Sequence, residues 1–185
     1  ALVSNQGSMD WLCLPRFDSG ACFAALLGSE DNGRWVIQPH DEFSSVRRYR
    51  DDTLVLETRF ETATGACTLI DFMPLKAPSQ CSSVVRLIRG DRGCVTMHTD
   101  LTFRFDYGLT VPWVQKTPTG ILALSGPHAV SVVTPVDLTG LDDARLVPVH
   151  LADETLTSLL RSGDVVDVLS PEAEVLARGA VVALP

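Results

Sequence analysis

The sequence has 185 residues, of which 45% are hydrophobic and 21% are charged, a composition typical of a folded chain with one core. Asp and Glu outnumber Lys and Arg by 23 to 15, and the net charge of -8 argues against a nucleic-acid partner because such a surface repels phosphates. No apolar run is long enough to cross a bilayer and no leader opens the chain, so we expect a soluble protein without a membrane partner.

The segment "SMDWLCLPRFDSG" at residues 8–20 mixes aromatic, apolar and charged side chains around a proline. One hypothesis makes it part of an enzyme. Asp10 and Asp18 then serve as the general acid and base of glycoside hydrolysis, and Trp11 stacks on a sugar.

A second hypothesis makes the same segment an ordered loop on which something else packs. Pro15 then forces Leu14 into an extended conformation, and Arg16 pairs with a nearby Asp. Trp11 and Phe17 fill the core in this interpretation. The residues alone leave both hypotheses open.

A short helix is predicted next, at "ACFAALLG" (21–28), with Asp18 or Ser19 as its N-cap and Gly28 as its C-cap. Alternation then predicts a hairpin of two strands, 53–60 and 66–73. We expect Gly65 to supply the positive φ of the hairpin turn.

The clearest alternation is "CVTMHTDLTFRF" (94–105), which has one apolar and one polar face. Further strands are predicted at 82–90, 120–126 and 129–135. Short strands separated by Gly, Pro and Asp turns indicate an all-β fold, mainly an antiparallel β-sandwich, with one or two short helices. The side chains that the pattern places in the core are Leu54, Leu56, Phe60, Leu69, Val95, Met97, Leu101, Phe103 and Phe105.

The pattern changes at 136–145, which we interpret as a junction between a sandwich domain (1–140) and a β-rich tail (141–185). The tail is expected to contain a capped helix at 152–164 and strands at 165–169 and 177–185.

Three further groups of residues bear on the chemistry. The cysteines (Cys13, Cys22, Cys67, Cys81 and Cys94) are odd in number and lack a C-x-x-C pair, which indicates reduced thiols in a cytoplasmic protein. The histidines (His40, His98, His128 and His150) show no metal-ligand spacing, so we expect structural or surface roles for them and neither metal nor cofactor. The basic stretch 46–50 precedes Asp51 and Asp52, which indicates a solvated, locally compensated edge.

The stretch "FDYGLTVPW" (105–113) resembles residues 8–20 in character, with Asp106 beside Tyr107 and Trp113 after a proline. We predict a second aromatic loop at the same end of the sandwich. Packing and binding are both open roles for its aromatic side chains.

Four stretches carry a family resemblance: "LVSNQGSMDWLCLPRFDSGACFAALLG", "GRWVIQP", "RRYRDDTLVLETRFETATGACTLIDFMP" and "LTFRFDYGLTVPWV". Together they closely resemble the amino-terminal domain of the trehalase-like and glucoamylase-like enzymes of glycoside hydrolase family 15. The resemblance implies a β-sandwich that precedes an (alpha/alpha)6 barrel, and the barrel carries the two catalytic glutamates.

The resemblance also implies what this chain does. No run of paired long helices follows residue 140, so we expect a non-catalytic domain that supports or packs on a barrel absent from the 185 residues. The residues expected to contact the barrel, or a sugar, are Trp11, Leu14, Arg16, Phe17, Asp18, Tyr107 and Trp113.

The tail at 145–185 instead resembles a SAF domain of pilus-assembly-type proteins, which suggests a natural or constructed fusion. Two other functions stay open: a stand-alone carbohydrate-active enzyme that uses Asp10, Asp18, Asp71 or Asp106, and a structural or interaction module or a chimera without evolved activity. Because a missing barrel would leave apolar side chains of 8–20 exposed, we also expect self-association, with a homodimer as its simplest form.

Overall fold

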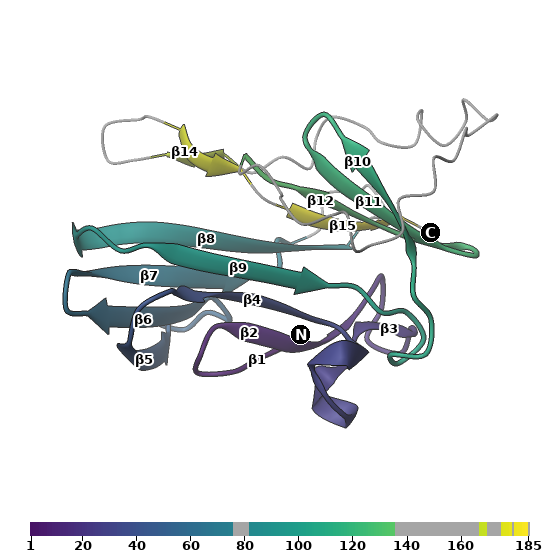
Figure 1. The fold of residues 1–185 in the computed structure, drawn as a ribbon, viewed down its shortest axis with the longest axis horizontal. Helices are drawn as coiled ribbons and strands as arrows, with labels where there is room; N and C mark the ends of the chain where they lie inside the picture. The colour runs from purple at the N-terminus through teal and green to yellow at the C-terminus, as the bar shows by residue number, and fades with distance from the viewer. Residues whose placement is uncertain (76–81, 136–166, 170–174, 179, 185) are drawn as a thin grey trace.

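The computed structural model describes residues 1–75 and 82–135, together with the backbone of three strands further along the chain. Figure 1 shows two stacked layers of strands. Helix is limited, among the described residues, to two short 3-10 turns, η1 (Ala25–Leu27) and η2 (Glu30–Asn32). The predicted all-β fold is therefore confirmed. None of the helices in the described ranges has the length and apolar character that a membrane span requires.

The first sheet has five strands in the order β1-β2-β4-β9, with β3 paired to β2. All its pairings are antiparallel, and β9 covers the whole length of β4. Its strands are β1 (Leu2–Val3), β2 (Ser8–Cys13), β3 (Ala21–Phe23), β4 (Arg34–Pro39) and β9 (Met97–Thr102).

The second sheet has eight strands in the order β10-β11-β12-β15-β8-β7-β6-β5. Its last strand in the chain, β15 (Ala180–Leu184), pairs with both β12 and β8 and so joins the two halves of the sheet. The other strands are β5 (Phe43–Tyr49), β6 (Leu56–Thr62), β7 (Gly65–Phe72), β8 (Ser82–Gly93), β10 (Trp113–Thr117), β11 (Gly120–Ser125) and β12 (His128–Val133).

A separate pair of strands, β13 (Asp167–Leu169) and β14 (Val175–Arg178), also lies in the tail. Strands are therefore found within both predicted ranges of the tail, 165–169 and 177–185, and residue 179 lies outside the described residues. The predicted helix at 152–164 lies outside the described residues.

The core lies between the sheets, where apolar side chains of both layers meet. Phe60 and Leu69 are fully buried, and the ring of Phe103 stacks between Phe23 and Phe105 with centroid separations of 5.1 and 6.5 Å. The core prediction is confirmed for these positions, while Leu56, Val95, Met97 and Leu101 are partly buried.

Leu54 was predicted to be core and is 87% exposed. The strand begins only at Leu56, because residues 50–55 form the turn that precedes it: the amide of Thr53 donates to the carbonyl of Arg50, and the amide of Arg50 donates to the carbonyl of Val55. The predicted strand, 53–60, therefore began three residues too early, within that turn.

The prediction of a helix at 21–28 was wrong. Residues 21–24 are all buried, and Ala21 and Phe23 pair with Cys13 and Leu12 of β2, so the apolar run is a buried strand rather than one face of a helix. The helical part of this range is limited to the 3-10 turn η1. Gly28 is the C-cap of that turn, where its amide donates to the carbonyl of Ala25, and its φ is -161°.

The predicted hairpin is confirmed as β6 and β7, but the role assigned to Gly65 was wrong. Gly65 is absent from the positive-φ residues of the chain. A Cβ at this position would lie 2.4 Å from the carbonyl oxygen of Arg92, so glycine is needed because β8 approaches closely.

A buried ion pair joins the two sheets. Arg86 of β8 donates to both carboxylate oxygens of Asp71 on β7 and, across the interface, to the carbonyl oxygens of Trp35 (2.5 Å) and Gly7 (2.7 Å). Its guanidinium also lies 5.2 Å from the centroid of the Trp35 ring. Because the Arg86 side chain has no exposed surface, these partners replace the water that it loses on folding.

The basic stretch at 46–50 lies at an edge of the second sheet, as predicted: residues 46–49 are in the edge strand β5 and Arg50 directly follows it. Its charge is compensated by Glu57 of β6 rather than by Asp51 and Asp52. Arg48 and Arg50 both pair with the Glu57 carboxylate, whose side chain is only 6% exposed. Hydrogen bonds from Arg50 and Arg48 lower the pKa of Glu57 below its ordinary value of 4.5.

Candidate functional site

The loop between β2 and β3 forms a tight tip around Phe17. Arg16 makes two hydrogen bonds of 2.8 Å to the Asp18 carboxylate, and the hydroxyl of Ser82 donates to the carbonyl of Pro15 from the other sheet. Phe17, at the centre of this tip, is 91% exposed. The loop is thus held by polar contacts at its base while its aromatic side chain faces solvent.

The ordered-loop hypothesis was right about Arg16, which pairs with Asp18, and wrong about Phe17, which is not core. Leu14 is buried, and Trp11 is partly buried. Neither Asp18 nor Ser19 caps a helix, because the segment that follows is β3.

The second aromatic loop is a tight turn closed by two hydrogen bonds. The amides and carbonyls of Phe105 and Thr110 exchange bonds of 2.8 and 3.0 Å. Between them, Asp106 and Tyr107 have φ of 51° and 59°, the left-handed region that few residues other than glycine adopt. Gly108 follows with φ 95°. Strained backbone of this kind persists where the surrounding structure enforces it, and it is common at functional sites.

The two aromatic loops lie together, as the sequence predicted. The rings of Trp11 and Tyr107 are tilted against each other with centroids 5.9 Å apart. Trp113, at the start of β10, is 55% exposed and borders a shallow hollow with Val111 and Leu124, but no described contact joins it to Trp11.

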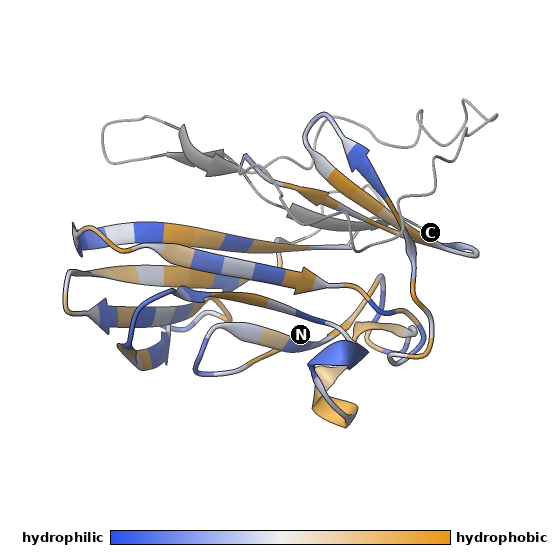
Figure 2. Ribbon diagram, viewed as in Figure 1, coloured by the Kyte–Doolittle hydropathy of each residue, from blue (hydrophilic) through white to orange (hydrophobic). Residues whose placement is uncertain are grey.

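Exposed apolar side chains accumulate on the segments of this end. Figure 1 shows η1, the loop before β3 and the loop that leads to β10 at the same end of the sandwich, and Figure 2 shows the apolar character of η1. We call this set the apolar end: Phe17, Leu26, Leu27, Tyr107, Leu109, Val111 and Trp113.

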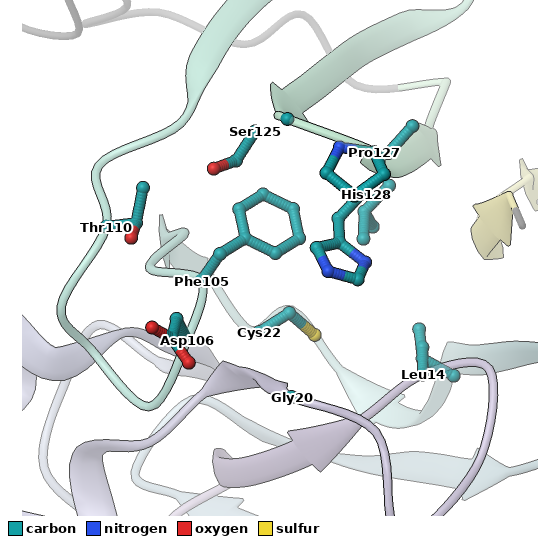
Figure 3. A pocket seen from close by; sticks show the side chains of 12 residues that line it. Leu14, Gly20, Cys22, Phe105, Asp106, Thr110, Ser125, Pro127 and His128 are labelled. Carbon is teal, nitrogen blue, oxygen red and sulfur yellow. The ribbon is translucent and has the colours of Figure 1, made fainter.

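A pocket of about 370 Å³ opens beside the second loop (Figure 3). The His128 imidazole stacks on the Phe105 ring in its wall, with centroids 6.4 Å apart. Its other walls come from the first loop, from β3 and from the turn between β11 and β12. Its lining residues include Leu14, Cys22, Asp106, Thr110, Ser125 and Val130.

The carboxylates of the enzyme hypothesis do not converge. Asp71 is in the buried ion pair with Arg86, and Asp18 is bonded to Arg16, which lowers the pKa of its carboxyl. Asp10 accepts a 2.5 Å hydrogen bond from the Ser8 hydroxyl. Asp106 is the one of the four that lines the pocket, so the described residues offer no acid and base pair there.

Cysteine chemistry is disfavoured as well. The described cysteines are free, and burial raises the pKa of the Cys22 thiol to about 12, which keeps it protonated. The described residues contain no cluster of His, Cys, Asp and Glu side chains that could hold a metal ion. Cys81 and His150 lie outside the described residues.

Sequence reasoning missed the polar wall of the pocket. Thr110, Ser125 and His128 attracted no functional hypothesis, and Phe105 was assigned only to the core. Two turn sequences could have indicated this wall. Asp-Tyr-Gly at 106–108 and Gly-Pro at 126–127 both interrupt strands just before polar side chains.

Sequence comparisons show which known proteins this chain resembles. A sequence model of a protein family, described as "Trehalase-like, N-terminal", matches residues 1–143. Trehalase 1 of Sulfolobus acidocaldarius is 33% identical over 127 residues, which are 68% of this chain and 21% of the relative. Trehalase 2 of the same organism is 30% identical over 121 residues, 65% of this chain and 19% of the relative.

A trehalase of Mycolicibacterium smegmatis is 40% identical over a shorter stretch of 65 residues, 35% of this chain and 10% of the relative. The chain therefore spans about a fifth or less of the length of these relatives. No solved structure matches the chain at a significant level.

Proposed function

Because the chain belongs to the family of trehalase-like N-terminal domains, we propose that it is the non-catalytic β-sandwich domain of a family 15 glycosidase and packs on a catalytic (alpha/alpha)6 barrel. The apolar end carries this proposal. It combines a held loop tip, a strained aromatic turn and exposed apolar side chains, as expected of a surface that another domain covers.

The contacts of the aspartate side chains favour a non-catalytic role over a catalytic one. Glycoside hydrolysis uses two carboxyl groups that flank the scissile bond, at most about 10 Å apart. Asp18 and Asp71 are each engaged with an arginine, and Asp106 has no second acidic residue beside it in the lining of the pocket.

Two finer proposals concern the tail and self-association. The resemblance of 145–185 to a SAF domain is carried by sequence alone, while the pairing of β15 with β12 and β8 supports a role of the last strand in the sandwich.

The apolar end supports a homodimer when no barrel covers it, and light scattering of the chain with and without Phe17→Ala tests this.

The first experiment asks whether the chain hydrolyses sugars. Glucose release from trehalose, maltose and malto-oligosaccharides is measured with the 185-residue chain, and we expect no turnover. Turnover that is lost in Asp106→Asn and kept in Asp41→Asn, an exposed aspartate outside the pocket, would support the enzyme hypothesis instead.

The second experiment asks whether the chain packs on a catalytic part. Trehalase 1 of S. acidocaldarius is prepared without the fifth of its length that this chain matches, and binding is measured by calorimetry. The relative's own matching fifth is the positive control. We expect a saturable complex that Phe17→Ala weakens and Val46→Ala does not, since Val46 is similarly exposed but lies on β5. If only the positive control binds, the packing proposal is wrong.

A further inference from the structure

We propose that the pocket beside the second aromatic loop binds a neutral, polyhydroxylated molecule of about the size of one sugar ring. This inference goes beyond the packing role, which requires the apolar end but not an occupied pocket. It rests on the polar groups, the mixed polar and apolar wall, the charge and the size of the pocket (Figure 3).

Polar side chains without partners converge on the pocket. The carboxylate of Asp106, the hydroxyls of Thr110 and Ser125 and the ring nitrogens of His128 make no side-chain hydrogen bond or ion pair in the described part of the chain. Figure 3 shows the Phe105 ring with His128 on one side and Thr110, Asp106 and Ser125 on the other. A ligand with several hydroxyl groups can donate to the carboxylate and exchange hydrogen bonds with the hydroxyls and imidazole.

The wall of the pocket mixes apolar and polar surface. Phe105, Leu14 and Val130 are buried apolar residues of the wall, and the exposed His128 imidazole stacks on the Phe105 ring. A sugar ring has a face of C–H groups and an edge of hydroxyls, so it matches a pocket that offers both apolar and hydrogen-bonding groups. Small-molecule sites typically combine apolar surface with a few polar groups that fix the orientation of the ligand.

The charge of the pocket selects against anions. None of its lining residues is Lys or Arg, and Asp106 is the one acidic side chain among them. A phosphate or carboxylate on the ligand would therefore meet repulsion without a compensating cation. The Cys22 thiol adds no negative charge, because burial raises its pKa to about 12.

The size of the pocket limits the ligand. A volume of about 370 Å³ is near the lower end of the roughly 300–1,000 Å³ of small-molecule sites. One ring fits this volume better than an oligosaccharide, whose further units would have to lie outside.

The test is a titration of the isotope-labelled 185-residue chain, followed by NMR, with D-glucose and with glucose 6-phosphate. We expect saturable shifts of the pocket residues with glucose, with a Kd of the order of millimolar. Glucose 6-phosphate should bind at least about tenfold more weakly, because of the charge argument.

Variants locate the site. Asp106→Asn should weaken glucose binding about tenfold without unfolding the turn, because Asn tolerates positive φ. Asp41→Asn is the matched control and should bind glucose normally. Phe17→Ala should also bind glucose normally, so this proposal and the packing proposal can fail independently. No saturable shift with glucose, binding that survives in Asp106→Asn, or equal binding of glucose 6-phosphate would each overturn the proposal.

Discussion

The middle of the sandwich and its apolar end differ in which groups are buried and paired. In the middle, the fully buried Arg86 bonds to Asp71 and to two backbone carbonyls of the other layer. At the apolar end, Phe17 is 91% exposed and the Asp106 carboxylate has no partner among the described side chains. The buried charge of Arg86 is therefore paired within this chain, whereas the end presents groups that another molecule can contact.

The contrast shows that a stable fold can present exposed apolar side chains at one end. Buried charges need partners to be tolerated, so the pairing of Arg86 with Asp71 must form for the chain to be stable. Exposed apolar groups on loops contribute little to folding and are therefore free to serve binding. Substitutions in the two regions should accordingly separate stability from binding.

The largest effect is expected at the buried ion pair. Arg86→Met leaves Asp71 buried without a partner and removes the link to Trp35 and Gly7, so it should lower the free energy of unfolding by about 3–5 kcal/mol. Urea denaturation measures this loss. Arg92→Ala, which removes an exposed pair with Glu61, is the control and should cost less than about 1 kcal/mol.

A comparable loss is expected in the aromatic core. Phe103 is 4% exposed and stacks on Phe23 and Phe105, so Phe103→Ala should leave a cavity and lower the free energy of unfolding by about 3–5 kcal/mol. Thermal and urea unfolding both report it. A change below about 1 kcal/mol would mean that the two sheets do not meet at this position.

A smaller, pH-dependent effect is expected at Glu57. Its pKa is lowered in the folded state, chiefly by Arg50 and then by Arg48, so its contribution is present above the ordinary pKa of 4.5 and is lost as the pH falls through the lower folded value. Glu57→Gln should cost about 1 kcal/mol at neutral pH. The difference from the unmutated chain should shrink with acidification below pH 4.5, and a difference that grows instead would contradict the ion-pair assignment.

The smallest effect on stability is expected at the apolar end. Phe17→Ala should change the free energy of unfolding by less than about 0.5 kcal/mol, because the side chain is almost fully exposed. Leu109→Ser, at an 81% exposed position, should behave similarly. A loss near that of Phe103→Ala would show that these side chains are core, and the contrast between the two regions would fail.

Local patterns predicted the sheets because alternation reports which face of a strand is buried. The hairpin of β6 and β7 and the buried face of 94–105 followed directly from it. The segment at 21–28 was misassigned because a short apolar run fits both a buried strand and a helix, and only its pairing with β2 decides.

The candidate site was less accessible from sequence because it depends on contacts between distant segments. The similar character of the two aromatic loops predicted their proximity, and the contact of Trp11 with Tyr107 confirms it. The pocket, in contrast, combines the Asp106 loop with the turn before His128, and no sequence spacing relates those segments. Arg86 and Asp71 offered a clearer pattern in the sequence: each is a charged residue with apolar residues at the two positions before it and the two positions after it.

Hydrogen–deuterium exchange tests the central claim most directly, namely that the apolar end is the docking face. Exchange of the chain is compared with and without Trehalase 1 of S. acidocaldarius that lacks the fifth matched by this chain, with the relative's own matching fifth as the reference. The account predicts new protection in residues 8–20 and 105–113 and none in β5. Protection confined to β5, or none where the reference is protected, would contradict it.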